Sequence, residues 1–229
     1  MTDLLSAVEV NPDDASQGVK SVVIWLHGLG DSGYGFAPIV PELALADELA
    51  TRFIFPHAPE RAVTINNGYR MRAWYDIKSM DLDKRADEAG VLESVEQVEA
   101  LIEQQIAQGI PASKIVIAGF SQGGVVAMHL ATRSKHKFAG IMAMSTYMCQ
   151  PQKLAEEHSK VNLHTPFMMM HGRQDDVVPM AIGVQAKDTL EQCGYTIRWH
   201  EFNMQHNVCA EQVQIIAQWL TDNLAESVA

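Results

Sequence analysis

Short apolar runs alternate with longer amphipathic stretches along most of this 229-residue chain, and this alternation constrains the fold more than any other feature. Most of the runs are continuously apolar, which is typical of strands covered on both faces of a sheet. The predicted strands are Ser21–Leu26, Arg52–Phe55, Lys114–Ala118, Phe138–Met144, Phe167–Met170 and Tyr195–Phe202. The last run has polar alternation, so we expect it at a sheet edge.

The stretches between the runs have helical periodicity. In Asp83–Gln108 the apolar residues Val91, Val95, Val98 and Ile102 recur at helical spacing and form one stripe. The other predicted helices are Gln122–Thr132, Met180–Gln192 and Val208–Leu224. Strands that alternate with helices predict an α/β fold with a mainly parallel sheet and helices on both faces.

No linker, repeat or low-complexity tract divides the chain, so we expect residues 1–229 to form a single domain. The least regular segment is His57–Lys84, which contains the turn signal Asn66-Asn67-Gly68. A loop of this length in a compact domain is usually functional. We therefore expect His57–Lys84 to be an irregular loop that covers a site.

Composition argues against several classes of partner. Lys and Arg number 17 and Asp and Glu number 28, which gives a net charge of −11. This balance disfavours nucleic acid and anionic membrane surfaces. The cysteines Cys149, Cys193 and Cys209 are scattered and form no disulfide framework. Neither a signal peptide nor an apolar run near the roughly 18 residues of a membrane span is visible, so we expect a cytoplasmic protein without stable membrane insertion.

Gly119-Phe120-Ser121-Gln122-Gly123 matches the pattern G-x-S-x-G between a predicted strand and a predicted helix. In this context the serine stands at the apex of a sharp turn, and the glycines allow strand and helix to approach closely. The amides at the start of the helix can stabilise an oxyanion. The alternative is an ordinary Gly-Ser turn, but the correct placement of strand and helix favours Ser121 as a nucleophile.

A serine hydroxyl needs a base, and in this arrangement the chain order is serine, acid, histidine. Among the histidines after Ser121, His206 lies in a loop between the last predicted strand and the last predicted helix. This loop is expected at the same edge of the sheet as the other strand-to-helix turns. We predict that His206 is the base. Asp175 and Asp176 follow the strand Phe167–Met170, and either carboxylate could orient the imidazole.

A second glycine-rich turn follows the first strand and contains G-x-G-x-x-G at Gly28, Gly30 and Gly33. One interpretation is a dinucleotide site in an oxidoreductase. That interpretation needs an acidic residue at the end of the second strand, where the chain instead continues Phe55-Pro56-His57-Ala58-Pro59, and Glu60 comes late. The oxidoreductase is therefore disfavoured.

The alternative is that this turn supplies half of an oxyanion hole. An H-G turn after the first strand donates one backbone amide, and the residue after the nucleophile donates the other. These residues are Leu29 and Gln122. A zinc hydrolase is disfavoured, because His200-Glu201 and His206 do not have the H-E-x-x-H spacing.

Together these motifs resemble the phospholipase/carboxylesterase family of small α/β-hydrolases, which includes the acyl-protein thioesterases. The matching segments occur in the family's order and no cap domain is inserted between them. They are Val23–Gly33, Phe55–Pro59, Arg72–Ile77, Ile117–Gly124, His171–Pro179 and the loop around His206.

The resemblance implies a serine hydrolase with the α/β-hydrolase fold that cleaves carboxylic esters or thioesters through an acyl-enzyme. Its H-G-x-x-D-x-x-V-P pattern assigns the acid to Asp175, not Asp176. It also implies that Asp76 is structural. The family often has His-Ser at the catalytic histidine, whereas this chain has His206-Asn207.

We further expect a shallow site with an apolar acyl groove. The candidate groove residues are Met71, Trp74, Met80 and Val177. The expected substrate is a small acyl ester or thioester, with an acylated protein or a lysophospholipid as alternatives, and neither a metal nor a cofactor is required. The resemblance also allows a homodimer.

Overall fold

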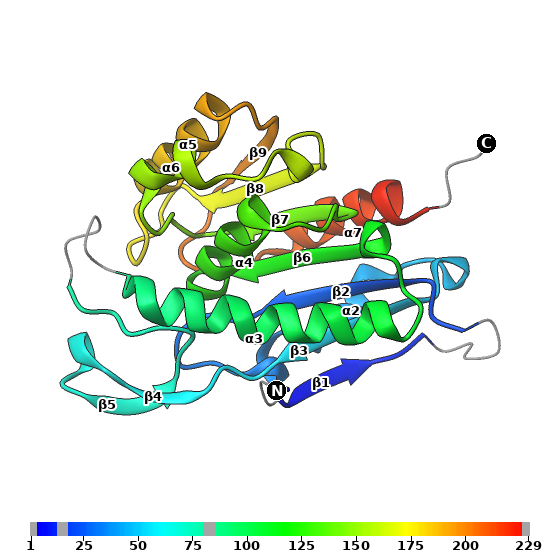
Figure 1. The fold of residues 1–229 in the computed structure, drawn as a ribbon, viewed down its shortest axis with the longest axis horizontal. Helices are drawn as coiled ribbons and strands as arrows, with labels where there is room; N and C mark the ends of the chain where they lie inside the picture. The colour runs from blue at the N-terminus through cyan, green and yellow to red at the C-terminus, as the bar shows by residue number, and fades with distance from the viewer. Residues whose placement is uncertain (1–3, 13–17, 80–85, 226–229) are drawn as a thin grey trace.

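The computed structural model describes residues 4–12, 18–79 and 86–225. Its main feature is a seven-stranded sheet with the order β1-β3-β2-β6-β7-β8-β9 (Figure 1). Only β1 runs antiparallel to its neighbour, and the other pairs are parallel. The strands are β1 (Ala7–Val10), β2 (Ser21–Leu26), β3 (Thr51–Pro56), β6 (Ile115–Phe120), β7 (Gly140–Met144), β8 (Phe167–Gly172) and β9 (Ile197–Phe202).

Helices cover both faces of this sheet. Figure 1 shows α3 and α4 in front of the sheet and α2 and α7 behind it. The helices are α1 (Gly33–Phe36), α2 (Ile39–Leu43), α3 (Glu88–Ala107), α4 (Gln122–Arg133), α5 (Leu154–Glu157), α6 (Met180–Gln192) and α7 (Ala210–Leu224). No helix among residues 4–12, 18–79 and 86–225 is long and apolar enough to cross a membrane.

The strands form two hydrophobic cores because successive side chains point to opposite faces of a sheet. In β2, Val22, Ile24 and Leu26 belong to the core under α3 and α4, whereas Val23 and Trp25 belong to the core under α7. All five are fully buried. This burial on both faces explains why β2 reads as a continuous apolar run in the sequence.

The predicted α/β fold with a mainly parallel sheet is confirmed, and β9 lies at an edge as expected. The helix predicted over Asp83–Gln108 begins at Glu88, and residues 83–85 lie outside the described part of the chain. The prediction of an irregular loop over His57–Lys84 was wrong in part. This segment forms the antiparallel hairpin of β4 (Glu60–Val63) and β5 (Tyr69–Arg72), whose polar strands gave no alternating signal.

The position of the site follows from the strand order. The connection from β2 leads to β3 on one side, and the connection from β6 leads to β7 on the other side. The carboxyl ends of β2 and β6 therefore flank a topological switch point, where open α/β sheets place their ligands. His27-Gly28 and Ser121 follow these two strand ends directly.

Candidate active site

Ser121 occupies a sharp turn between β6 and α4. Its backbone has φ 52° and ψ −117°, a left-handed conformation that is strained for a residue with a side chain. The Ser121 amide donates to the Met144 carbonyl at 2.8 Å, which fixes the turn to β7. A Cβ atom on Gly119 would lie 2.3 Å from the Gly123 carbonyl oxygen, and one on Gly123 would lie 2.4 Å from the Leu26 oxygen. The close packing of β2, β6 and α4 thus requires both glycines.

His206 lies beside this turn, in the loop between β9 and α7. Its Nε2 is 2.9 Å from the Ser121 hydroxyl oxygen, and its Nδ1 is 2.7 Å from Oδ2 of Asp175. An ionised carboxylate only accepts hydrogen bonds, so Nδ1 carries the proton and Nε2 is free to accept from the serine. The structure therefore joins Ser121, His206 and Asp175 in one hydrogen-bonded chain.

Asp175 is held rigidly in the loop between β8 and α6. Its Oδ1 accepts hydrogen bonds from the amides of Val177 at 3.0 Å and Val178 at 2.8 Å. Burial raises the pKa of this carboxyl, but the bonds from His206 and the two amides outweigh burial and hold the pKa below its ordinary value. The side chain of Asp175 is therefore an oriented, ionised acceptor.

His171 supports the same loop, and the sequence reasoning did not assign it a role. Its ring is buried, and its Nε2 donates to the Val178 carbonyl at 2.8 Å. A Cβ on Gly183 of α6 would lie 2.3 Å from the His171 ring. The His171-Gly172 pair at the end of β8 is the only sequence signal, since it mirrors His27-Gly28 at the end of β2.

The glycine-rich turn lies against the nucleophile turn. A Cβ on Gly28 would be 3.5 Å from the Cβ of Ser121. Within the described part of the chain, neither the Leu29 amide nor the Gln122 amide donates to another backbone carbonyl. Two free amides beside a serine hydroxyl can together receive the negative charge of a tetrahedral intermediate. The turn leads only into the four-residue helix α1, which is too short for the helix of a dinucleotide site.

The predicted groove residues differ in their exposure to solvent. Met71 is half-buried on β5, and its sulfur would be 3.7 Å from a Cβ on Gly30 in the glycine-rich turn. Val177 is 45% exposed beside Asp175. Trp74 is fully buried and offers no surface to a substrate, so its assignment to the groove was wrong. Met80 lies outside the described residues.

Asp76 has the structural role that the resemblance implied. Its Oδ1 accepts from the Thr64 amide at 2.7 Å and its Oδ2 accepts from the Thr64 hydroxyl at 2.6 Å. These bonds connect the end of β4 to the segment that follows β5. Among the described residues, no group of three or more His, Cys, Asp or Glu side chains could hold a metal ion.

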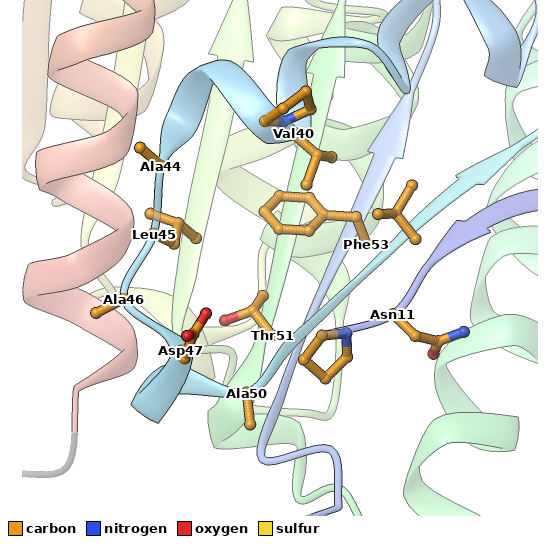
Figure 2. Close-up of a pocket in the computed structure, with 12 residues that line it drawn as sticks. Asn11, Val40, Ala44, Leu45, Ala46, Asp47, Ala50, Thr51 and Phe53 are labelled. Carbon is orange, nitrogen blue, oxygen red and sulfur yellow. The ribbon is translucent and has the colours of Figure 1, made fainter. Parts of the chain in front are cut away.

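Two of the hollows in the described surface differ in their relation to the predicted site. One of about 680 Å³ lies beside His206 and is lined by Asp176, Val177, Gln205 and neighbouring residues. The other, of about 310 Å³, lies where α2 and the start of β3 meet the end of β1 (Figure 2). None of the predicted site residues lines this second hollow, which is at the amino end of β3.

Comparison with known proteins gives consistent matches. The family model described as Phospholipase/Carboxylesterase matches residues 8–224. Acyl-protein thioesterase 1 of Neurospora crassa is 39% identical over 213 residues, which cover 89% of this chain and 87% of the relative. Acyl-protein thioesterase 1 of Saccharomyces cerevisiae is 33% identical over 217 residues, covering 91% of this chain and 95% of the relative.

Solved structures show the same similarity. The crystal structure of Arabidopsis thaliana SOBER1 has a TM-score of 0.85 and 28% identity, and covers 90% of this chain and 100% of that chain. The crystal structure of Zea mays acyl-protein thioesterase 2 has a TM-score of 0.84 and 26% identity, and covers 96% of this chain and 99% of that chain.

Proposed function

Because the chain belongs to the phospholipase/carboxylesterase family and is a carboxylic ester and thioester hydrolase, we propose that Ser121, His206 and Asp175 are its catalytic triad. The observation that carries this proposal is the hydrogen-bonded chain from the Ser121 hydroxyl through His206 to Asp175, at 2.9 and 2.7 Å. Nucleophile, base and orienting acid have the geometry that acyl transfer needs.

The proposed reaction has two halves. His206 Nε2 takes the Ser121 proton while the serine oxygen attacks the acyl carbonyl, whose oxygen becomes an oxyanion held by the amides of Leu29 and Gln122. The intermediate collapses, the bond to the leaving alcohol or thiol breaks, and His206 returns the proton to that group. Water then attacks the acyl-enzyme carbonyl while His206 takes one of its protons. The bond from the acyl carbon to the Ser121 oxygen breaks, His206 returns the proton to that oxygen, and the carboxylic acid leaves.

Substitution of Ser121 tests the nucleophile. Ser121→Ala should abolish turnover of p-nitrophenyl esters and covalent labelling by a fluorophosphonate. Ser145→Ala is the matched control, because Ser145 also follows a parallel strand with positive φ but its hydroxyl has no hydrogen-bond partner among the described residues. The control variant should still be labelled at Ser121. Turnover that survives Ser121→Ala would refute the triad.

The substrate class is the second part of the proposal. The relatives are named acyl-protein thioesterases, so we propose an acyl thioester on a protein as substrate, with a lysophospholipid as the alternative. Met71 and Val177 are the proposed apolar contacts of the acyl chain. We expect kcat/KM on p-nitrophenyl esters to rise with acyl length, and an acyl thioester of matched length to be cleaved as well. A rate that falls steadily with acyl length would contradict an apolar groove.

Cellular location and assembly complete the proposal. We propose a cytoplasmic enzyme that can form a homodimer, in line with the family resemblance. Cell fractionation tests the first statement, and sedimentation across a concentration series tests the second.

A further inference from the structure

The two proposed oxyanion donors belong to segments that are far apart in the chain, and Trp74 lies between them. The Trp74 indole Nε1 donates to the His27 carbonyl at 2.8 Å, on the side of Leu29. The Trp74 backbone amide donates to Oε1 of Gln122 at 2.8 Å. Trp74, His27 and Gln122 are all at least 98% buried, so water does not compete for these bonds.

The segment that contains Trp74, residues 72–75, also hydrogen-bonds to the glycine-rich turn on both sides of Leu29. Trp74 binds the His27 carbonyl, two residues before Leu29, and the Arg72 carbonyl accepts from the Gly30 amide at 2.9 Å, one residue after it. Leu29 therefore lies within a short stretch of backbone that is fixed at both ends. Its own amide remains free to donate to a ligand.

The Gln122 side chain fixes the other donor to the same segment. Its Oε1 accepts from the Trp74 amide and its Nε2 donates to the Tyr75 carbonyl at 2.7 Å. Both polar ends of this buried side chain are therefore used on residues 74–75. Because Gln122 is the first residue of α4, these bonds also fix its backbone amide, which is the second proposed donor.

We propose that residues 72–75 are an oxyanion strap, in which Trp74 and the Gln122 side chain are positioning residues that set the separation of the two donor amides. The inference rests on the proposed function. Stabilisation of an oxyanion depends on donors that are already in place, and loss of one donor typically lowers the rate about 100- to 1000-fold. A donor that is present but misplaced should lower the rate by a smaller factor, because displacements on the order of 1 Å are enough to slow catalysis.

The test compares two identical substitutions at buried tryptophans. Trp74→Phe removes the indole donor to the His27 carbonyl, whereas Trp25→Phe removes an indole nitrogen that has no partner among the described residues. Both side chains are fully buried. Rates are expressed per active site, counted by fluorophosphonate titration to completion, and measured well below the melting temperature, so that a change in stability alone does not alter them.

We expect Trp74→Phe to lower kcat about 10- to 100-fold with KM within about threefold of wild type, and Trp25→Phe to change kcat less than about threefold. A trifluoromethyl ketone, which forms an oxyanion when Ser121 adds to it, should lose affinity for the Trp74→Phe variant by the same factor as kcat/KM. The affinity of a non-reactive ground-state analogue should stay constant. Gln122→Met, which keeps the backbone amide but removes both side-chain bonds, should show the same selective loss.

Three results would overturn the strap. The first is that Trp74→Phe and Trp25→Phe have the same kcat. The second is that Trp74→Phe raises KM but leaves kcat unchanged. The third is that Trp74→Phe lowers kcat but keeps its affinity for the trifluoromethyl ketone. Failure of the triad gives a different result, namely turnover that persists in Ser121→Ala. The two proposals are therefore tested separately.

Discussion

At the scale of single residues, Asp175 and Asp176 show how neighbours in the chain acquire different environments. Asp175 is buried and accepts hydrogen bonds from His206, Val177 and Val178, whereas Asp176 is exposed and lines the hollow beside His206. Buried carboxylates with directed donors orient their partners, and exposed ones are solvated. This difference supports Asp175 as the acid of the proposed triad.

Neutralisation of each aspartate provides a matched pair. Asp175→Asn should lower kcat about 1000- to 10,000-fold, because an amide can donate to His206 Nδ1 and so favour the wrong tautomer. Asp176→Asn should change kcat less than about threefold, since no proton transfer depends on it. Steady-state kinetics on one p-nitrophenyl ester decides the matter, and a larger loss for Asp176→Asn would move the acid to that residue.

At the scale of elements, the turn from β6 to α4 is determined by contact between backbones. Gly123 packs against the carboxyl end of β2, where the Leu26 and His27 carbonyl oxygens would lie 2.4 and 2.6 Å from an added Cβ. Carbonyl oxygens of a central strand cannot move aside as a flexible side chain can. The strained backbone of Ser121 is therefore maintained by the surrounding sheet and helix rather than by local preference.

Two glycine-to-alanine substitutions distinguish the cost of a steric overlap from the cost of a strained backbone conformation. Gly123→Ala should destabilise the fold by about 3 kcal/mol or more, because the methyl group overlaps β2. Gly68→Ala, in the β4–β5 turn, has φ +74° and open space around the Cβ position, so it should cost only about 1 to 2 kcal/mol of backbone strain. Urea unfolding measures both values. Equal costs would show that close packing does not fix the β6–α4 turn.

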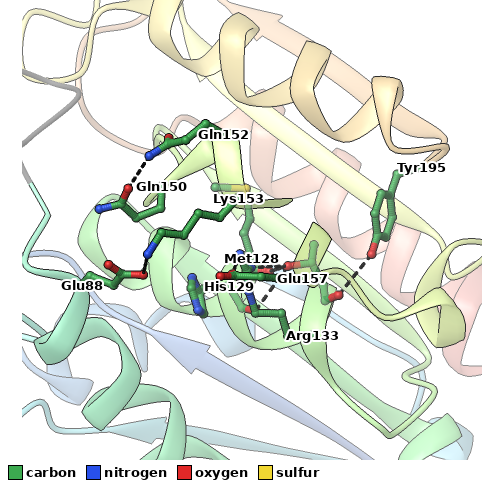
Figure 3. Close-up of polar contacts among 10 residues, drawn as sticks. Glu88, Met128, His129, Arg133, Gln150, Gln152, Lys153, Glu157 and Tyr195 are labelled. Carbon is green, nitrogen blue, oxygen red and sulfur yellow. Dashed lines mark hydrogen bonds and ion pairs between the residues drawn. The ribbon is translucent and has the colours of Figure 1, made fainter. Parts of the chain in front are cut away.

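At the scale of the whole molecule, the polar side chain of His129 is buried where α3, α4 and α5 meet. Figure 3 shows His129 among the ion pairs Lys153–Glu88 and Arg133–Glu157. His129 is 5% exposed, and neither of its ring nitrogens has a hydrogen-bond partner in the described part of the chain. Burial, followed by the charge of Arg133, lowers the pKa of His129 to about 4.

This burial predicts loss of stability in acid. In the unfolded chain the His129 pKa returns to near 6.5, so the unfolded state binds a proton at a higher pH than the folded state does. The free energy of unfolding should therefore fall as the pH drops from about 6.5 to about 4, by about 3 kcal/mol from this group. His129→Leu should reduce that slope, as measured by urea midpoints between pH 7.5 and 4.5.

His164→Leu, at an exposed histidine, is the control for replacing any histidine by leucine. His27 and His171 are also buried with lowered pKa values, so part of the slope should remain in His129→Leu. A His129→Leu variant with the slope of the wild-type protein would show that His129 is solvated in solution.

The sequence predicted the features that depend on local pattern. Continuous apolar runs identified the central strands, and the glycines of G-x-S-x-G identified the turn at Ser121, because these signals arise from burial on both faces and from close backbone contact. The antiparallel edge strand β1 and the hairpin β4–β5 were missed. β1 has only four residues, and the hairpin strands are polar, so their pairing depends on a neighbouring strand rather than on their own periodicity.

The sequence by itself thus determined the fold class, the position of Ser121 at a strand-to-helix turn and the histidine most suited to act on it. Without the family resemblance, the sequence left Asp175 and Asp176 open, and the tertiary structure shows that Asp175 contacts His206. Tertiary structure alone decided that Trp74 lies buried between the proposed oxyanion donors instead of lining a groove. The physical reason is that burial and hydrogen-bond partners depend on packing between distant segments. The sequence around Trp74 does not distinguish a tryptophan that faces solvent from one that hydrogen-bonds both to His27, after β2, and to Gln122 of α4.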